Sequence, residues 1–455
     1  MHETLSAIES PETRPWYAGI ERYQWLVLII AAAGWAFDQY ESQIFTHTKD
    51  RIFSEIGGFI GTQRDSWTNY LYAVFLLGSA TGGLLAGTLA DRFGRRPLLA
   101  ATILFYSLFA GVMYFATTMW QVCLIRFLVA MGIGGEWAVG AALVAESFPK
   151  RARAYVSGIF HSSSVFGIWM ATAVGMCVHE YFQDEWRYAY LVGVLPALLT
   201  FSVFTQVHEP KKWQAKSEKL HESAGQRKRL GSFKELLGNP QWRRRALLGC
   251  ALAAVGLATF WGVMVAGRDL IRDVLERNVA AETGFVAGSP ELKQAIKDSN
   301  VESRTTFAYG FVQIGGAGVG MLLFGPISAR IGRRAAFIIF HVLAFIVTPI
   351  ACFVPQTYWQ LLIIMPIFAF IVQAFHAGYA IYFPELFPTH LRATGTSFCF
   401  NGGRFGTIPM MLLSAWFISE GIDLRWAVTC MGTLFLVGAV IMFFLPETNR
   451  QELPE

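Results

Sequence analysis

Charged residues and cysteines are both scarce in this sequence of 455 residues. Charged residues make up 15% of the chain, against about 25% in soluble domains, and 54% of the residues are hydrophobic. That balance excludes an ordinary soluble domain. The six cysteines lie in apolar segments without a Cys-x-x-Cys pair, which gives no basis for a disulfide framework or a metal site. The sequence also lacks a nucleophile–base pattern, so neither an enzyme nor a cofactor is expected.

Long apolar runs are the dominant feature of the chain. Mean hydropathy is +0.41, and the apolar residues gather in blocks of about 20, the length that crosses a bilayer as a helix. No charged segment with a short apolar core and a cleavage site precedes the first block, so no removable signal peptide is expected. The pattern predicts an all-α membrane protein of twelve transmembrane helices, near residues 22–46, 67–90, 97–118, 120–146, 153–179, 187–207, 246–266, 304–328, 335–354, 357–383, 393–418 and 425–445.

Lys and Arg are distributed unevenly between the predicted loops. The termini and the loops after helices 2, 4, 6, 8 and 10 hold 24 of the 37 Lys and Arg residues, and the other five loops hold 11. By the positive-inside rule the richer side is cytoplasmic, which places both termini there in a cell inner membrane. Residues 208–245 are expected to form a basic, solvated linker between residues 1–207 and 246–455, and the latter include an extended external loop, 267–303. The net charge of only +5 gives no reason to expect a nucleic-acid partner.

The two predicted halves share sequence patterns. "GTLADRFGRRPLL" (87–99) is echoed by "GPISARIGRRAAF" (325–337), and "ESFPKRARAYVSGIFHSSSVFG" (146–167) is echoed by "ELFPTHLRATGTSFCFNGGRFG" (385–406). Two pseudo-symmetric six-helix halves indicate a transporter whose halves rock around a central site. A membrane sensor that binds a metabolite without moving it is the alternative, but it would need a signalling domain, for which the tails offer no room.

Four motifs carry a resemblance to a known family. "GTLADRFGRRP" resembles the loop motif of the major facilitator superfamily, and the resemblance extends over essentially the whole chain. "PELFPTHLRATG" and the terminal "LPETN" resemble the branch that contains sugar porters, organic-ion transporters and metabolite:proton symporters. "GIGGEWAVGAALVAESFP" is most similar to the sialate/lactate and related symporters. The resemblance implies a proton-coupled symporter of a small organic anion that works by alternating access. We expect a monomer whose partners are its small-molecule substrate, protons and the lipid bilayer.

The resemblance also assigns ion pairs to the cytoplasmic ends of the helices, where they would latch the inner side in the outward-facing state. The latch residues are Asp91, Arg95, Glu146 and Arg153 in the first half and Glu385 and Arg392 in the second. The second copy of the loop motif has Ala329 and Arg330 but no acid, so its latch is expected to be weaker. The alternative is that the basic residues only anchor short loops on the inner side.

Two ionisable residues lie at similar depth in helices 1 and 4. From a rise of 1.5 Å per residue and helix ends near 46 and 120, Asp38 lies about 12 Å and Arg126 about 9 Å below the outer face. Sugar porters and their relatives pair an acid in helix 1 with an Arg in helix 4 to couple protons, and these two residues match those positions. The alternative is a static buried ion pair, which loss of activity alone would not distinguish.

Two further acids lie in the same helices. Glu41, one turn after Asp38, matches the second acid of an Asp-x-x-Asp pattern in related symporters, and the alternative for it is a hydrated residue at the mouth. Glu136 lies near mid-membrane in a glycine-rich stretch that permits close approach of helices. Proton carriage is one interpretation of Glu136, and a hydrogen bond between helices is the other.

Arg404, in "CFNGGRFGTIP", lies in the middle of helix 11. An Arg cannot shed its proton and must face a polar cavity or an acid, and its planar fork suits a carboxylate. Organic-anion carriers of the superfamily place an Arg in this helix, so Arg404 is expected to bind substrate, with pairing to a protein acid as the alternative. Softer substrate-binding candidates, each with a structural alternative, are His161, Gln313, Gln373, His376 and Trp137.

Sugar or polyol:proton symport is the nearest rival function. Sugar porters read hydroxyl groups with amides, usually a Gln pair in helix 7. Here that helix reads "GLATFWGVMVAG", without Gln or Asn, which disfavours a sugar. An organic-cation exporter is disfavoured because Arg404 would repel its substrate.

Overall fold

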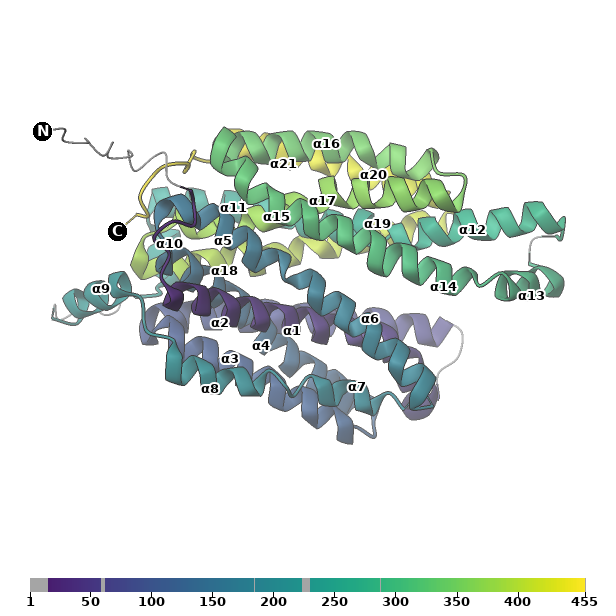
Figure 1. Cartoon of the computed structure of the whole chain (residues 1–455), viewed down its shortest axis with the longest axis horizontal. Coiled ribbons are helices and arrows are strands. Elements are labelled where there is room, and N and C mark those ends of the chain that lie inside the picture. Colours follow the sequence, from purple (N-terminus) through teal and green to yellow (C-terminus); the bar gives the residue numbers. More distant parts are fainter. Residues whose placement is uncertain (1–14, 59–61, 184, 223–229, 287, 455) are drawn as a thin grey trace, which may run out of the picture.

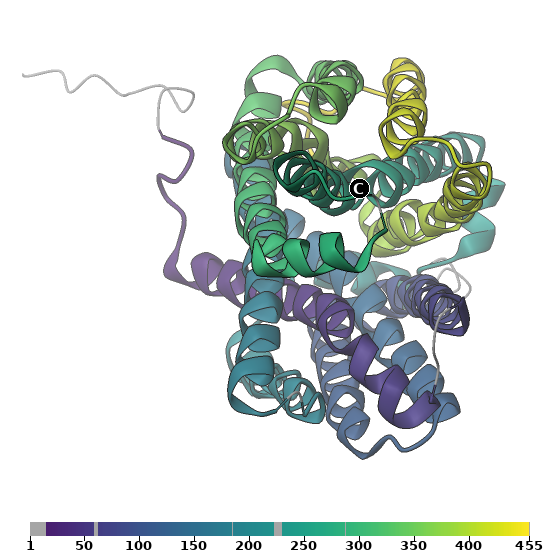
Figure 2. The ribbon, with the colours of Figure 1, turned by 90° about the vertical axis from the view of Figure 1, so that its right-hand side faces the viewer.

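The computed structural model describes residues 15–58, 62–183, 185–222, 230–286 and 288–454. These residues form helices joined by turns, and no β-strand occurs among them. The helices run along the long axis of the molecule in two groups, which Figure 1 shows as one half that begins in purple and another that runs from teal to yellow. Figure 2 shows the same two groups from the end that carries α12 and α13. The prediction of an all-α protein with two helical halves is confirmed.

The first half surrounds helix α4. Its elements are α1 (Arg22–Ile52), the π-helix η1 (Phe53–Gly57), α2 (Thr62–Phe93), α3 (Arg95–Val112), η2 (Met113–Phe115), α4 (Met119–Ser147), α5 (Lys150–Ser162), α6 (Ser164–Tyr181), α7 (Arg187–Val192) and α8 (Ala197–Gln206). Small residues and apolar residues on all sides let α4 pack against α1, α2, α3 and, from the other half, α18. A helix that is apolar all round belongs in the interior.

The second half surrounds α17 in the same way. Two short helices of the linker precede it, α9 (Lys211–Glu222) and α10 (Phe233–Gly238). Its elements are α11 (Pro240–Thr259), the π-helix η4 (Phe260–Met264), α12 (Gly267–Thr283), α13 (Pro290–Asp298), α14 (Val301–Thr306), the π-helix η5 (Phe307–Gln313), α15 (Ile314–Ile331), α16 (Arg333–Phe353), α17 (Tyr358–Leu386), η6 (Thr389–Leu391), α18 (Arg392–Gly403), η7 (Arg404–Gly406), α19 (Thr407–Ser419), α20 (Leu424–Gly432) and α21 (Leu434–Phe444).

Glycines bring helix backbones into contact at equivalent places in the two halves. A Cβ atom on Gly82 of α2 would lie 2.0 Å from the Met131 carbonyl oxygen of α4. A Cβ atom on Gly320 of α15 would lie 2.1 Å from the Phe370 carbonyl oxygen of α17. Any side chain at either glycine would push the helices apart, so each pair is locked at its closest approach. The pseudo-symmetry of the sequence therefore extends to helix packing.

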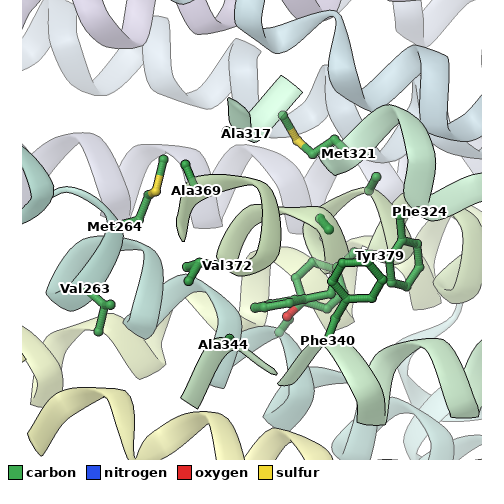
Figure 3. Close-up of a cluster of buried hydrophobic side chains, with 14 of the residues drawn as sticks. Val263, Met264, Ala317, Met321, Phe324, Phe340, Ala344, Ala369, Val372 and Tyr379 are labelled. Carbon is green, nitrogen blue, oxygen red and sulfur yellow. The ribbon is translucent and has the colours of Figure 1, made fainter. Parts of the chain in front are cut away.

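The core of the second half is a continuous apolar cluster between η4, α15, α16 and α17. Figure 3 shows side chains from these elements gathered in one cluster, among them Phe324, Phe340 and Tyr379. The Phe324 and Phe340 rings lie 5.4 Å apart between centroids. This packing holds α17 against both neighbours and so fixes the wall of the central cavity described below.

The membrane-spanning pattern agrees with twelve helices. Ten helical segments of the described residues are long and apolar enough to cross a membrane. The first expected span, now α1, and the eleventh, now α18 and α19, are not among the ten; they carry Asp38, Glu41 and Arg404. One boundary differs in an important way, because α1 ends at Ile52 rather than near 46. Asp38 therefore lies about 21 Å from the end of its helix, at 1.5 Å per residue, rather than about 12 Å.

The two ends of the bundle are built differently. Both described chain ends pack at the end that carries α9 and α10, while α12 and α13 project from the opposite end (Figure 1). The expected external loop therefore consists largely of helices, and α12 buries Leu270, Ile271 and Val274. Part of the linker is held against the bundle, since the Trp213 indole N–H of α9 donates to the Asp91 main-chain oxygen at 3.1 Å.

Candidate functional site

A cavity of about 210 Å³ lies between the two halves. Both halves contribute to its walls. The first half supplies α1, α2, α4, α5 and α6, and the second supplies α11, η4, α12, η5, α15, α17, α18, η7 and α19. Its most polar lining residues are Gln39, Gln43, Arg126, His161, Arg268, Gln373, His376 and Arg404. Three of these are arginines, and the lining contains no Asp or Glu. The cavity is therefore positively charged along its described wall.

Arg404 occupies a break between two helices. The chain passes from α18 through the short η7 turn into α19, so the side chain starts from a bend rather than from a regular helix. Its Nη1 donates to the side-chain oxygen of Asn401, and its guanidinium carbon lies 5.3 Å from the Phe400 ring centroid. No described carboxylate forms an ion pair with it. Arg404 also lines a neighbouring, largely apolar pocket of about 550 Å³.

The resemblance implied that Arg126 pairs with Asp38, but the structure does not bring the two together. The Arg126 side chain donates from Nη1 to the main-chain oxygen of Glu41 at 3.0 Å, and its guanidinium carbon lies 4.6 Å from the Phe45 ring and 4.3 Å from the Phe75 ring. The two depths differ because α1 continues six residues past its predicted end. Asp38 is therefore closer to the middle of the bundle than Arg126 is.

The three candidate proton-coupling acids of the first half lie behind the cavity wall. Asp38, Glu41 and Glu136 are 0%, 0% and 2% exposed, and their carboxyl oxygens make no hydrogen bond within the described part of the chain. Asp38 and Glu136 adjoin each other and the Tyr106 hydroxyl. The Glu136 carboxyl packs on Gly34 of α1, close enough to exclude any side chain there.

Glu41 is not a hydrated residue at the mouth. Its carboxyl packs against Gly193, between α7 and α8, where an added Cβ would lie 1.6 Å from its Oε1 atom. Two of the three acids nevertheless interact electrostatically with a cavity arginine, Glu41 with Arg126 and Asp38 with Arg404. The site thus consists of arginines on the cavity surface and carboxyl groups in the layer behind them.

The softer candidates divide into two groups. His161, His376 and Gln373 line the cavity. Trp137 and Gln313 do not: the Trp137 indole N–H donates to His161 Nδ1 at 3.1 Å, and the Gln313 amide N–H donates to the Met264 carbonyl oxygen at 3.1 Å. Trp137 therefore orients a cavity histidine, and Gln313 joins η5 to η4.

Three polar residues of the cavity were missed by sequence reasoning. Gln39 and Gln43 lie on α1 beside the acids that attracted attention, and their four-residue spacing places them on one face. Arg268 was taken for a residue of the external loop, but α12 continues the line of helix 7 and brings it to the cavity.

The Glu146 carboxylate is the centre of the latch at the end that carries the termini. It forms ion pairs with Arg95 of its own half at 3.1 Å and with Arg392 of the other half at 2.6 Å. All three side chains are fully buried. Asp91 pairs with Arg95 at 2.8 Å and accepts hydrogen bonds from the Thr394 N–H at 2.8 Å and hydroxyl at 2.6 Å. Asp91 thus holds the N-terminus of α18, where an anion is favoured.

Two predicted latch assignments require correction. Arg153 does not pair with Glu146, since its Nε donates to the Ala145 carbonyl oxygen at 3.1 Å. Glu385 does not pair with Arg392 but with Arg333, at 3.0 Å. Glu146–Arg392 is therefore a buried ion pair that joins the halves, and Lys150–Glu452, at 3.7 Å, is an exposed one. Arg333 was missed, although the repeated "GRR" of the loop motif places it in the position equivalent to that of Arg95.

A second pair of acids caps the helices that follow the loop motif. Glu209 accepts hydrogen bonds from the Arg95 and Arg96 N–H groups, and Glu447 of "LPETN" accepts them from Arg333 and Arg334. Each carboxylate satisfies N–H groups that have no partner within the helix. Burial raises the pKa of Glu209, and the two N–H groups act in the opposite direction.

Replacing Glu146 with glutamine is expected to open this end of the bundle. The change removes the carboxylate that compensates two buried arginines, and breaking a buried pair costs about 3–5 kcal/mol. In a cysteine-free background with Ala393→Cys, which is buried beneath the latch, the rate of maleimide labelling should rise at least about tenfold. Glu385→Gln is the matched control, because its ion pair with Arg333 lies within one half. An equal rise in both variants would contradict a special role for Glu146.

The geometry defines a class of membrane protein. Two helical groups enclose one cavity, and ion pairs between the groups close one end, which is the arrangement of a transporter that opens to each side in turn. Two family models match the sequence, "Sugar (and other) transporter" over residues 23–234 and "Major Facilitator Superfamily" over residues 280–455. The chain belongs to the major facilitator superfamily. It is a multi-pass membrane transporter rather than an enzyme.

Similar proteins have related descriptions. The "Probable 4-methylmuconolactone transporter" of Cupriavidus pinatubonensis is 28% identical, over 95% of this chain and 93% of its own length. The "Niacin transporter NiaP" of Acinetobacter baylyi is 24% identical, over 95% of this chain and 96% of its own. The solved structure of the proton:xylose symporter XylE matches with a TM-score of 0.66 at 17% identity, over 95% of this chain and 98% of that one. At this identity the structural match shows the fold alone.

Proposed function

We propose that this protein is a proton-coupled symporter of a small organic anion, specifically a carboxylate. The observation that carries the proposal is the charge of the central cavity, which three arginines line without any Asp or Glu in the described wall. Such a surface repels a cation and offers a neutral sugar only hydrogen bonds to uncharged oxygens, whereas a carboxylate gains stronger, charge-assisted hydrogen bonds. The relatives described as carrying a muconolactone and niacin are consistent with an acid substrate.

Proton coupling is supported by the acids behind the wall. When Asp38 is ionised, its negative charge partly compensates the positive charge of Arg404, and the site then attracts a substrate anion less strongly. When Asp38 binds a proton, Arg404 loses that compensation and attracts the substrate carboxylate. Glu41 stands in the same relation to Arg126. Proton and anion are thereby loaded together, which is the requirement for symport.

Alternating access and orientation complete the proposal. The Glu146–Arg392 ion pair closes the end that carries the termini, so the cavity is served from the end that carries α12. The excess of Lys and Arg at the closed end supports a cytoplasmic assignment in a bacterial-type inner membrane. Intact cells should label a cysteine at Phe285 and spare one at Ala215, and the reverse result would invert the orientation. One chain forms the whole cavity, which supports a monomeric transporter.

Sugar:proton symport is the second candidate, favoured by the amides Gln39, Gln43 and Gln373 on the cavity wall. The deciding experiment is uptake by proteoliposomes of labelled monocarboxylates, dicarboxylates and sugars, with and without an inward proton gradient. We expect a carboxylate to accumulate only with the gradient. Accumulation of a sugar but of no acid would replace the anion assignment, and equal uptake with and without the gradient would remove proton coupling.

A further inference from the structure

Arg126 is a buried cation without an ion-pair partner among the described residues. It is 1% exposed, and its Nε and Nη2 atoms have no hydrogen-bond partner in the same part of the chain. No described carboxylate forms an ion pair with it, and the Glu41 carboxyl acts on it only electrostatically, because that group is turned against Gly193. Burying an uncompensated guanidinium is costly, so the free donors of Arg126 require an anion from elsewhere.

The surroundings of Arg126 hold it in place without satisfying it. The rings of Phe45 and Phe75 make cation–π contacts at 4.6 and 4.3 Å, and aromatic rings offer no acceptor in the plane of the guanidinium. The residue also lines the central cavity. Its two free N–H donors are therefore positioned by the protein for a group that enters the cavity.

Arg404 presents a second such cation from the opposite half. Its side-chain acceptor is the Asn401 amide oxygen, a neutral group, and Asp38 acts on it only from behind the wall. Arg268, the third arginine of the cavity, differs because it is paired with Glu302 at the outer end of the bundle. Within the described chain, two of the three cavity arginines thus lack an ion-pair partner, one on α4 and one on η7.

We propose that the substrate is a short dicarboxylate whose two carboxylates bind Arg126 and Arg404. This inference rests on the proposed anion symport and narrows it to one substrate class. A cavity of about 210 Å³ is smaller than the pockets of about 300–1,000 Å³ that hold drug-sized ligands, which suits a short acid. Because the two arginines belong to different halves, a bound dicarboxylate links the halves and compensates both cations at once. A monocarboxylate would leave one cation unpaired.

The test compares dicarboxylates with their own monoamides, which keep the length and shape but remove one charge. Binding of succinate, glutarate and adipate, each with its monoamide, is measured by calorimetry on the purified full-length protein. Wild type should bind at least one dicarboxylate at least about tenfold more tightly than its monoamide. Arg126→Gln should reduce that preference to less than about threefold without weakening the monoamide. Arg272→Gln, which removes an exposed charge of α12 outside the cavity, should leave the preference unchanged.

Three results would overturn the dicarboxylate assignment: equal affinity of wild type for each acid and its monoamide, an unchanged preference in Arg126→Gln, or no binding of any dicarboxylate. The wider anion proposal fails separately, if sugars bind and no acid of either kind does. The thermal unfolding of each variant without ligand is compared with wild type. Arg126→Lys serves if the glutamine variant unfolds, since it keeps the charge and loses the fork, and it should reduce the preference by at least about threefold.

Discussion

Asp38→Asn is expected to abolish proton-driven accumulation of substrate while sparing its exchange between equal compartments. Accumulation needs a group that binds a proton on one side and releases it on the other, and asparagine cannot do so. Exchange needs only the binding site and its reorientation, both of which the variant retains. The change is isosteric and breaks no ion pair, because the described chain has none at the Asp38 carboxyl.

The measurement is uptake against a gradient and counterflow in the same proteoliposome preparation. Accumulation should fall at least about a hundredfold, to the level of passive equilibration, and counterflow should stay within about threefold of wild type. Asp423→Asn, an exposed change at the start of α20, is the control. Joint loss of both activities would indicate a structural role for Asp38. Normal accumulation would remove it from the mechanism and leave Glu41 or Glu136 as the proton carrier.

Arg404→Ala is expected to lose carboxylate binding, and Arg404→Lys is expected to raise the apparent KM at least about tenfold. A charge-assisted bidentate pair contributes about 1.5–3 kcal/mol, and lysine keeps the charge but not the two parallel donors. Neither change breaks an ion pair within the protein, because none involves Arg404 in the described chain. Both variants should therefore insert and fold.

A thermal-shift titration with candidate acids on wild type and both variants measures this effect. Wild type should be stabilised by the acid in proportion to its occupancy, and Arg404→Ala should not respond. Arg425→Ala, which removes an exposed ion pair with Asp423, controls for the loss of a positive charge. Equal stabilisation of wild type and Arg404→Ala would show that the anion binds elsewhere, and stabilisation of wild type by neutral sugars alone would favour the sugar assignment.

Hydropathy, charge and repetition in the sequence predicted the two helical halves, because a span of about 20 apolar residues has few alternatives in a bilayer. The same signals did not predict how the helices meet. The predicted Asp38–Arg126 pair depended on where helix 1 was expected to end. The polar residues between 46 and 52 gave no sign that the helix continues through them. An error of six residues moves a side chain about 9 Å along a helix, at 1.5 Å per residue, which is enough to change its partner.

The latch shows a second limit of sequence reasoning. The repeat places Glu146 and Glu385, and Arg153 and Arg392, in equivalent positions, so equivalent pairing within each half was the simple expectation. The structure instead pairs Glu146 with Arg392 across the halves. A repeat shows that a motif occurs twice. It does not show which copy supplies the ion-pair partner of a given residue, because that depends on how the halves are docked. Similarly, Arg404 was recognisable as unusual from its position in an apolar helix, whereas Arg126 was expected to have a partner.

The two capping acids, Glu209 and Glu447, bear on how the two halves can move. Each follows the last helix of its half and closes a helix of that same half, so neither half depends on the other for this contact. In the proposed alternating access, these contacts can stay intact while one half turns against the other. The Glu146–Arg392 pair joins the halves and must break in the same movement.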